Sequence, residues 1–295
     1  MRAIAAACLL GVMASPALAY TAAGDRLFPA TILLPQIGPS DDFYITPSTI
    51  PQYGGTGPHD RLTNTSVVYN KTITERFSVG FEDGWNSFSQ PGAAGGTAYG
   101  WQNLETTAKY LAILDPDHEF ELSLGVDREW GGTGAKGIGA DPVGATTPQI
   151  LFGKGMNELP WPYMQPFAVG AVLGYQLADT GARADQIQTA VVLEYSIPYL
   201  EAKVANLNLP EFFRRVTPML EVQFNTPGSP ARGALTSGTL APGFNYAGEG
   251  WEVGVEALIP TTKGAGSGAG VAAQLHLSLD YLFPDSLGRP IFYRH

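Results

Sequence analysis

The sequence has little cysteine and little charge. Its 295 residues include one cysteine, Cys8, and charged residues make up 15% of the chain, against about 25% in a typical soluble domain. A single cysteine excludes a disulfide within the chain. Acidic residues outnumber basic ones by 27 to 17, and the net charge of −10 disfavours a basic nucleic-acid binder.

Long hydrophobic runs are also missing beyond the N-terminus. No later stretch reaches the roughly 18 apolar residues that a transmembrane helix requires. Hydrophobic residues nevertheless make up 44% of the chain and aromatic residues 11%, which favours an ordered protein. The 36 glycines and 23 prolines disfavour a helical bundle or a coiled coil. If such a chain crosses a membrane, it does so as a closed β-barrel.

The N-terminus has the three parts of a secretory signal peptide. Met1 and Arg2 provide the positive end, an apolar stretch runs from Ile4 to Met13, and Ala17-Leu18-Ala19 is typical of a cleavage site. We therefore expect residues 1–19 to be a signal peptide that is removed before Tyr20, together with Cys8. The mature chain then has no thiol and depends on something other than disulfides for stability.

Apolar and polar residues alternate along most of the remaining chain. From residue 216 to 224 the even positions are apolar and the odd positions are polar, with Met219 as the exception. The same alternation recurs at 120–127, 251–259 and 274–283, and more loosely at 187–197. A period of two predicts β-strands, because successive side chains of a strand point to opposite faces.

The expected strands are long, and their connections alternate between short and long. Several runs match the roughly 9 to 11 residues that cross a bilayer as a tilted strand. Tight turns at 74–76, 114–118 and 247–249 alternate with longer segments rich in glycine and small residues, as in transmembrane barrels. We expect twelve strands, near 42–50, 66–73, 77–85, 101–113, 119–130, 147–154, 165–176, 186–197, 215–226, 239–246, 250–260 and 270–283.

These patterns predict an all-β protein, an antiparallel transmembrane up-and-down β-barrel of about 12 strands. The barrel would span residues 42–283, and the order of the connections places both chain ends in the periplasm. We expect residues 20–41 to form an N-terminal periplasmic arm, with a partial plug or a disordered segment as alternatives. Residues 284–295 would form a C-terminal periplasmic tail. A secreted, soluble β-sandwich is the alternative fold.

Aromatic residues gather near the ends of the expected strands. Outer-membrane barrels carry two aromatic girdles, one at each membrane interface, whereas a β-sandwich core would scatter these residues along the strands. The predicted girdle residues are Trp85, Trp101 and Trp130 beside the long loops, and Trp161, Tyr195, Trp251, Tyr281 and Phe283 at the opposite end.

The polar face of the strands is predominantly acidic and would line the barrel. Rings of one charge set ion selectivity, so an open acidic lumen would favour cations. A barrel packed solid with side chains, acting as a structural or interaction protein, is the alternative. The predicted lumen-facing residues are Glu105, Lys109, Glu121, Asp127, Glu129, Glu194, Arg215, Glu221, Gln223, Glu252, Glu256, Gln274, His276 and Asp280.

A catalytic site is a weaker interpretation of the sequence. His276, Ser278 and Asp280 share one face and suggest a lipid- or ester-acting hydrolase, but alternate residues of a strand lie about 6.6 to 6.8 Å apart. That spacing is too long for a hydrogen bond from nucleophile to base. The histidines are scattered, which predicts no metal site, and a Gly-rich match at 132–137 lacks the helix that a dinucleotide site needs. We therefore expect no cofactor.

Two segments resemble known families. The alternation from Leu275 through Tyr281 to Phe283 resembles the C-terminal signature strand of Gram-negative outer-membrane proteins, although Phe283 is not the last residue. The general layout, with Phe152-Gly153-Lys154-Gly155 and residues 286–290, is similar to exported barrels grouped with transporters of aromatic-degradation pathways. This resemblance implies passage of small solutes across the outer membrane. The expected partners are outer-membrane lipid, the barrel-assembly machinery through the last strand and a small solute, without nucleic acid.

Overall fold

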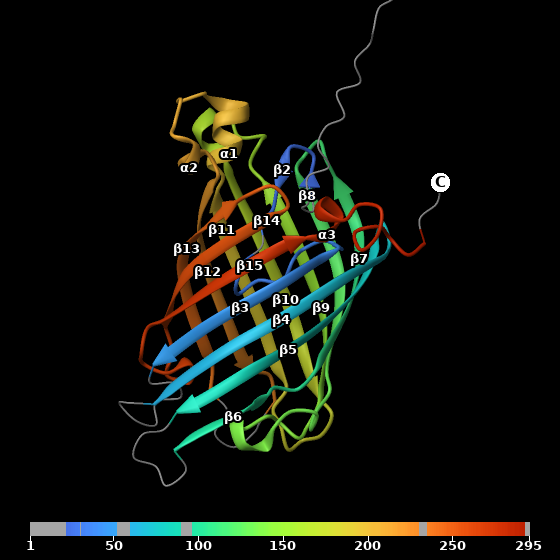
Figure 1. The fold of residues 1–295 in the computed structure, drawn as a ribbon, viewed down its shortest axis with the longest axis vertical. Coiled ribbons are helices and arrows are strands. Elements are labelled where there is room, and N and C mark those ends of the chain that lie inside the picture. Colours follow the sequence, from blue (N-terminus) through green and yellow to red (C-terminus); the bar gives the residue numbers. More distant parts are fainter. Residues whose placement is uncertain (1–21, 30, 52–59, 90–95, 230–234, 293–295) are drawn as a thin grey trace, which may run out of the picture.

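The chain forms a closed antiparallel β-barrel of twelve strands (Figure 1). The computed structural model describes residues 22–29, 31–51, 60–89, 96–229 and 235–292; the predicted signal peptide lies outside this range. This confirms the predicted fold class and strand number. The barrel strands are β3 (Asp42–Pro51), β4 (Arg61–Thr74), β5 (Phe77–Ser89), β7 (Glu105–Asp115), β8 (Phe120–Glu129), β9 (Ala145–Gly155), β10 (Phe167–Ala178), β11 (Gln186–Tyr195), β12 (Val216–Pro227), β13 (Ser237–Ala247), β14 (Trp251–Pro260) and β15 (Gly270–Ser278).

Each strand pairs with its neighbours in the sequence, and pairing of β15 with β3 closes the barrel. The alternation of apolar and polar residues in the sequence corresponds to side chains that point alternately out of and into the barrel. On β11, Val191 and Leu193 are exposed on the outside, whereas Val192 and Glu194 are buried inside. An apolar outer face and a more polar inner face are typical of barrels that face lipid. Among the described residues, no helix is both long and apolar enough to span a membrane.

The two ends of the barrel differ. The tight turns after β4, β7 and β13 lie at the end that also carries α1 (Ile197–Tyr199), α2 (Glu211–Arg214) and α3 (Leu279–Leu282) (Figure 1). We call this end the terminal end, because the described chain begins and finishes there. The opposite end, which we call the loop end, carries the connections after β8 and β14, with 3-10 turns at Lys136–Ile138 and Lys263–Ala265, whereas the long connection from β11 to β12 lies at the terminal end.

One barrel position is shared by two strands, the short β6 and the longer β7. The expected strand 101–113 is interrupted: β6 (Thr97–Trp101) pairs with the end of β5, and β7 pairs with its beginning. The register runs from Trp85↔Trp101 to Glu82↔Glu105, so three residues, 102–104, lie opposite two, 83–84. One extra residue on one strand is a β-bulge, which bends the wall locally.

The last strand is shorter than the sequence predicts. It ends at Ser278, not at residue 283, and the chain turns into α3. The Leu279 N–H donates to the Asp41 carbonyl at 2.8 Å, and Ser278 Oγ donates to the Asp280 carboxylate at 2.6 Å, which ends the ladder. Asp280, Tyr281 and Phe283 therefore lie at the terminal end beyond the wall, a correction to the expected strand 270–283.

The C-terminal tail folds back onto the barrel. The N–H groups of Ile291 and Phe292 donate to carbonyls at the end of β4, at 3.2 and 2.8 Å. Lys71 Nζ donates to the carbonyls of Leu287 and Arg289 and pairs with the Asp41 carboxylate at 2.5 Å. The described part of the tail is thus attached to the terminal end of the wall.

Candidate functional site

Most of the segment before the first barrel strand lies inside the barrel, and its start forms a short hairpin of β1 (Ala22–Ala23) and β2 (Arg26–Leu27) at the terminal end, where Asp25 is exposed (Figure 1). We call residues 23–41 the plug. Phe28, Leu34 and Ile37 are buried in one cluster with inward-facing residues of the wall, among them Leu151, Ala168, Ala190, Val192 and Met219. The segment 20–41 was expected to be a periplasmic arm; its described part instead corresponds to the alternative of a partial plug.

Small residues in the wall make room for the plug. A Cβ atom added to Gly153 would lie 2.8 Å from the Phe28 ring, and one added to Gly170 would lie 3.2 Å from the Ile37 side chain. The apolar side chains of the plug are removed from water when they enter these recesses. This hydrophobic gain is the physical reason why the plug lies inside the barrel. Met219, the exception to the alternation of its strand, is an inward residue that contacts the plug cluster.

Four of the predicted lumen residues bind the plug backbone. Both carboxylate oxygens of Glu221 accept backbone N–H groups, from Ile32 at 2.9 Å and from Leu33 at 3.0 Å. The amides of Gln223 and Gln274 each donate to a plug carbonyl at 3.2 Å, and Lys109 Nζ donates to the Gln36 carbonyl. A buried segment outside the barrel sheet needs such partners for its peptide groups.

A buried ion pair holds the start of the plug at the terminal end. Arg26 Nε lies 3.2 Å from the Glu119 carboxylate, and both side chains are almost fully buried. The same guanidinium donates to the carbonyls of Pro166 and Gln165 at 3.0 and 2.5 Å and lies 4.0 Å above the Tyr199 ring. Burial and the neighbouring Glu119 raise the pKa of Tyr199 to about 12, so the phenol stays neutral at physiological pH.

In the part of the barrel that the structure describes, one cavity lies beside the plug and another lies at the loop end. The inner cavity, about 290 Å³, lies between the plug and the walls of β3, β4, β5, β7 and β8. Its charged lining consists of Glu82, Glu105, Asp127 and Lys109, three carboxyl groups against one amine. The mouth cavity, about 430 Å³, lies at the loop end. Glu105 lines both cavities, so they adjoin at this carboxyl group.

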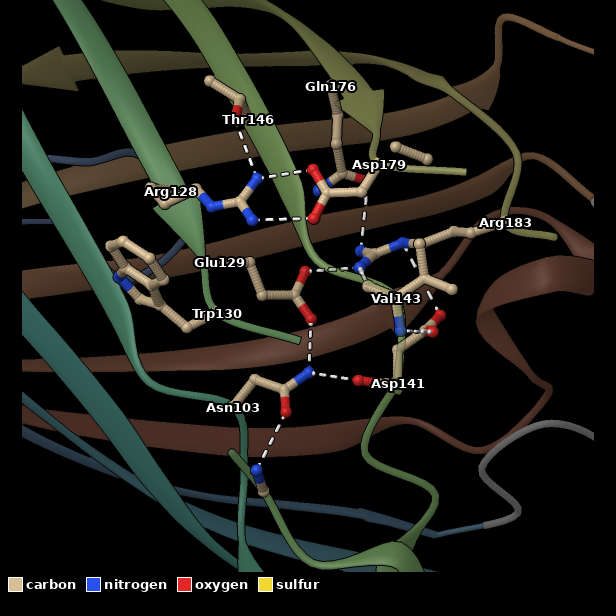
Figure 2. Close-up of polar contacts among 12 residues, drawn as sticks. Asn103, Arg128, Glu129, Trp130, Asp141, Val143, Thr146, Gln176, Asp179 and Arg183 are labelled. Carbon is tan, nitrogen blue, oxygen red and sulfur yellow. Dashed lines mark hydrogen bonds and ion pairs between the residues drawn. The ribbon is translucent and has the colours of Figure 1, made fainter. Parts of the chain in front are cut away.

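Arg183 crosses the mouth from the loop between β10 and β11 (Figure 2). Its guanidinium pairs with Glu129 at 2.7 Å and with Asp141 at 3.6 Å, and donates to the Val143 carbonyl at 3.0 Å. Asn103, on the bulge between β6 and β7, donates to Glu129 and to the Asp141 carbonyl, each at 2.8 Å. These contacts attach two long loops to the wall and narrow the mouth.

A second ion pair supports the same loops. Arg128 binds the Asp179 carboxylate with two hydrogen bonds of 2.6 and 2.7 Å, and also donates to Thr146 at 3.0 Å (Figure 2). Hydrogen bonds from this guanidinium lower the pKa of Asp179 below its usual range. A bidentate pair fixes geometry more firmly than a single contact.

His276 occupies a separate buried cluster near the terminal end. Its Nε2 lies 3.6 Å from Asp42, its Nδ1 lies 3.4 Å from Glu252, and its ring stacks on Tyr44 at 4.4 Å. Ser278 Oγ donates its proton to Asp280. Both ring nitrogens thus face carboxylates and the serine proton is directed to a third, an arrangement that does not support the hydrolase alternative.

The other predicted lumen residues occupy different environments. Glu121, Glu194, Glu252 and Glu256 are buried inside the barrel. Arg215 lies between α2 and β12, where it pairs with Glu211 at 3.1 Å. Glu129 belongs to the mouth. Five residues of these sites are not among the predicted ones: Arg26, Asp42, Glu82, Asn103 and Arg183.

The predicted girdle residues lie near the two ends. Trp85 and Trp101 pack edge to face at 5.3 Å near the loop end, and Trp130 follows β8 there. Trp161 lies in the turn after β9, Tyr195 ends β11 and Trp251 begins β14, all at the terminal end. Tyr281 and Phe283 lie at the terminal end within and after α3.

Comparison with known proteins identifies solved structures that have a similar fold. No protein-family model matches the chain, and a search of curated protein sequences gave no significant match. An outer-membrane channel from Pseudomonas putida F1 is similar in structure, with a TM-score of 0.55, 12% identity, and coverage of 85% of this chain and 99% of that one. KdgM porin has a TM-score of 0.49 and 10% identity, with coverage of 80% of this chain and 98% of that one. NanC porin has a TM-score of 0.48 and 9% identity, with the same two coverages. The chain therefore has the fold of Gram-negative outer-membrane β-barrels.

Proposed function

We propose that the protein is an outer-membrane channel for small solutes whose acidic interior favours cations. The observation that supports this proposal most directly is the pair of adjoining cavities that meet at Glu105. The inner cavity contains three carboxyl groups, of Glu82, Glu105 and Asp127, and one amine. An excess of negative charge in a narrow space attracts cations and repels anions. The apolar outer wall fits a location in outer-membrane lipid after export by the signal peptide and assembly through β15.

The plug sets the conductance in this proposal. It packs against the wall with one cluster around Phe28 and with a second one, through Ile32 and Leu33, nearer the loop end, whereas the inner cavity lies beside it. Passage of a solute from one end to the other therefore requires displacement of part of the plug. A low conductance with the plug seated, and a higher one after its release, is the expected behaviour.

Reconstitution in planar bilayers tests the selectivity. Under a potassium chloride gradient, the reversal potential of the wild-type protein should show cation preference, and Glu82→Gln with Glu105→Gln should reduce it. Glu75→Gln, the same change at an exposed turn, serves as the control. Anion preference in the wild type, or a reversal potential that the double variant leaves unchanged, would contradict the proposal.

The plug cluster also favours a second candidate, a structural barrel with a closed interior. Its apolar contacts resemble those of a packed core. This candidate predicts that no current appears even when the contacts of the plug are weakened. Conductance measurements on plug variants therefore separate the two functions.

A further inference from the structure

The wall has an apolar groove on its outer face at the bulge between β6 and β7. The groove has a volume of about 510 Å³ and is lined by Val67, Tyr69, Phe81, Glu82, Asp83, Trp101, Leu104 and Thr133. Phe81 and Trp101 are each 50% exposed, so this face of the groove is open to the surroundings of the barrel. Trp101 belongs to the predicted girdle, which places the groove just inside the loop-end interface.

The bulge replaces wall hydrogen bonds with loop contacts. The Leu104 N–H donates to Thr133 Oγ1 and the Trp130 N–H donates to the Leu104 carbonyl, each at 2.9 Å. The Gly84 N–H donates to the side chain of Asp83 at 2.7 Å. One backbone hydrogen bond, from the Gln102 N–H to the Gly84 carbonyl at 2.7 Å, crosses the wall at the bulge, and side-chain and loop atoms supply the other contacts.

Asp83 places a carboxylate on a face that is otherwise apolar. It is paired with Val67 in the register and follows Glu82, whose side chain lines the inner cavity. A carboxylate beside apolar side chains attracts a cation more strongly than one in bulk water, because the local dielectric is lower. Aromatic rings around it add a further preference for a cation.

Glu82 lines both the groove and the inner cavity, which lie on opposite sides of the wall. Glu105, its register partner, lines the inner cavity and the mouth cavity. The wall at Glu82 therefore separates the groove from the inner cavity, whereas the inner cavity and the mouth cavity share Glu105. Carboxyl groups outnumber the cationic groups, Lys109 and Arg183, along these spaces.

We propose that the groove is a binding site for amphiphilic cations, molecules with an apolar chain or ring and one ammonium group. The apolar part lies against Phe81, Leu104 and Trp101, and the ammonium group pairs with Asp83. A solute that has partitioned into the loop-end leaflet thereby reaches the wall beside Glu82. The step from the groove to the inner cavity rests on the proposed channel function, whereas binding to the groove does not.

Quenching of tryptophan fluorescence measures the binding directly. The protein in phosphatidylcholine vesicles is titrated with bromoundecyltrimethylammonium, and bromoundecanol is the uncharged comparison. The bromine quenches Trp101, and the Trp101→Phe variant identifies its share of the signal. Asp83→Asn should require an about tenfold higher concentration of the ammonium probe for half-quenching, because a cation beside a carboxylate at partial exposure gains an interaction of that order. It should leave the bromoundecanol curve in place.

Asp285→Asn makes the same chemical change at an exposed position outside the groove and should leave both curves unchanged. Phe81→Ala should weaken both probes alike, since it removes apolar contact without changing charge. Equal curves for the ammonium probe in wild type and Asp83→Asn would overturn the site, whether or not the protein conducts. A channel without cation preference would overturn the proposed function and leave the quenching result standing.

Discussion

Removal of the Phe28 ring should release the plug. Phe28 is 1% exposed and its ring contacts the recess at Gly153, so Phe28→Ala removes a buried aromatic side chain from the centre of the plug cluster. Truncation of a buried phenylalanine typically costs about 3–5 kcal/mol. Because the twelve-stranded wall does not depend on this contact, the loss falls on the docked state of the plug. At about 1.4 kcal/mol per tenfold, the population of the released plug should rise by roughly a hundredfold or more.

Cysteine labelling measures that population. The expected mature chain has no cysteine, so Leu34→Cys introduces a single thiol into the buried plug. In the Phe28→Ala background, a membrane-impermeant maleimide should label it at least tenfold faster than in the parent, and single-channel conductance should rise. Leu173→Ala, on the exposed outer face, is the matched control and should change neither. An unchanged labelling rate in Phe28→Ala would refute the reasoning, because the plug would then be held by contacts other than this cluster.

Three further predictions concern the plug, the mouth and the barrel as a whole. Glu221→Gln keeps one oxygen that can accept a neutral hydrogen bond of about 0.5–1.5 kcal/mol and places an NH2 donor against the second plug N–H, so the same thiol should be labelled faster than in the parent; equal rates in the parent and Glu221→Gln would contradict this. The lowered pKa of Asp179 means that its ion pair stabilises the loop above the ordinary aspartate pKa and is lost as the pH falls through the lowered value. Proteolysis of the 179–185 loop by an acid-active protease should therefore increase below about pH 4 in the wild type, and Asp179→Asn should be cut readily at every pH; a wild type with no pH dependence would argue against the pair. Finally, protein from outer-membrane fractions should migrate differently on a gel before and after boiling, since a closed barrel resists detergent, and identical migration would contradict a stable barrel.

The wall could be predicted from the sequence, because alternation and turn residues act locally. The tight turns at 74–76 and 247–249 fall where the structure has them, between β4 and β5 and between β13 and β14. The end of the last strand could not be predicted, because the alternation continues through Tyr281 whereas the chain turns at Ser278 to meet Asp41. That contact joins residues at opposite ends of the sequence.

The sequence contains an indication of the plug that can be interpreted only once the structure is known. Its own residues, 23–41, have no periodicity, but Met219 and Val192 interrupt the polar face of two strands because they contact Phe28 and its neighbours. An apolar residue on the inner face of a barrel indicates something apolar inside. Arg183 had no comparable signal, since its partners Glu129 and Asp141 meet it through the folding of loops.

The reversal potential of the reconstituted protein under a potassium chloride gradient, with Phe28→Ala used to release the plug, tests the central claim most directly. The account predicts a cation-selective current that is small in the wild type, larger in Phe28→Ala, and less selective when Glu82 and Glu105 are both replaced by glutamine. An anion-selective current, or no current in a folded Phe28→Ala barrel, would contradict it.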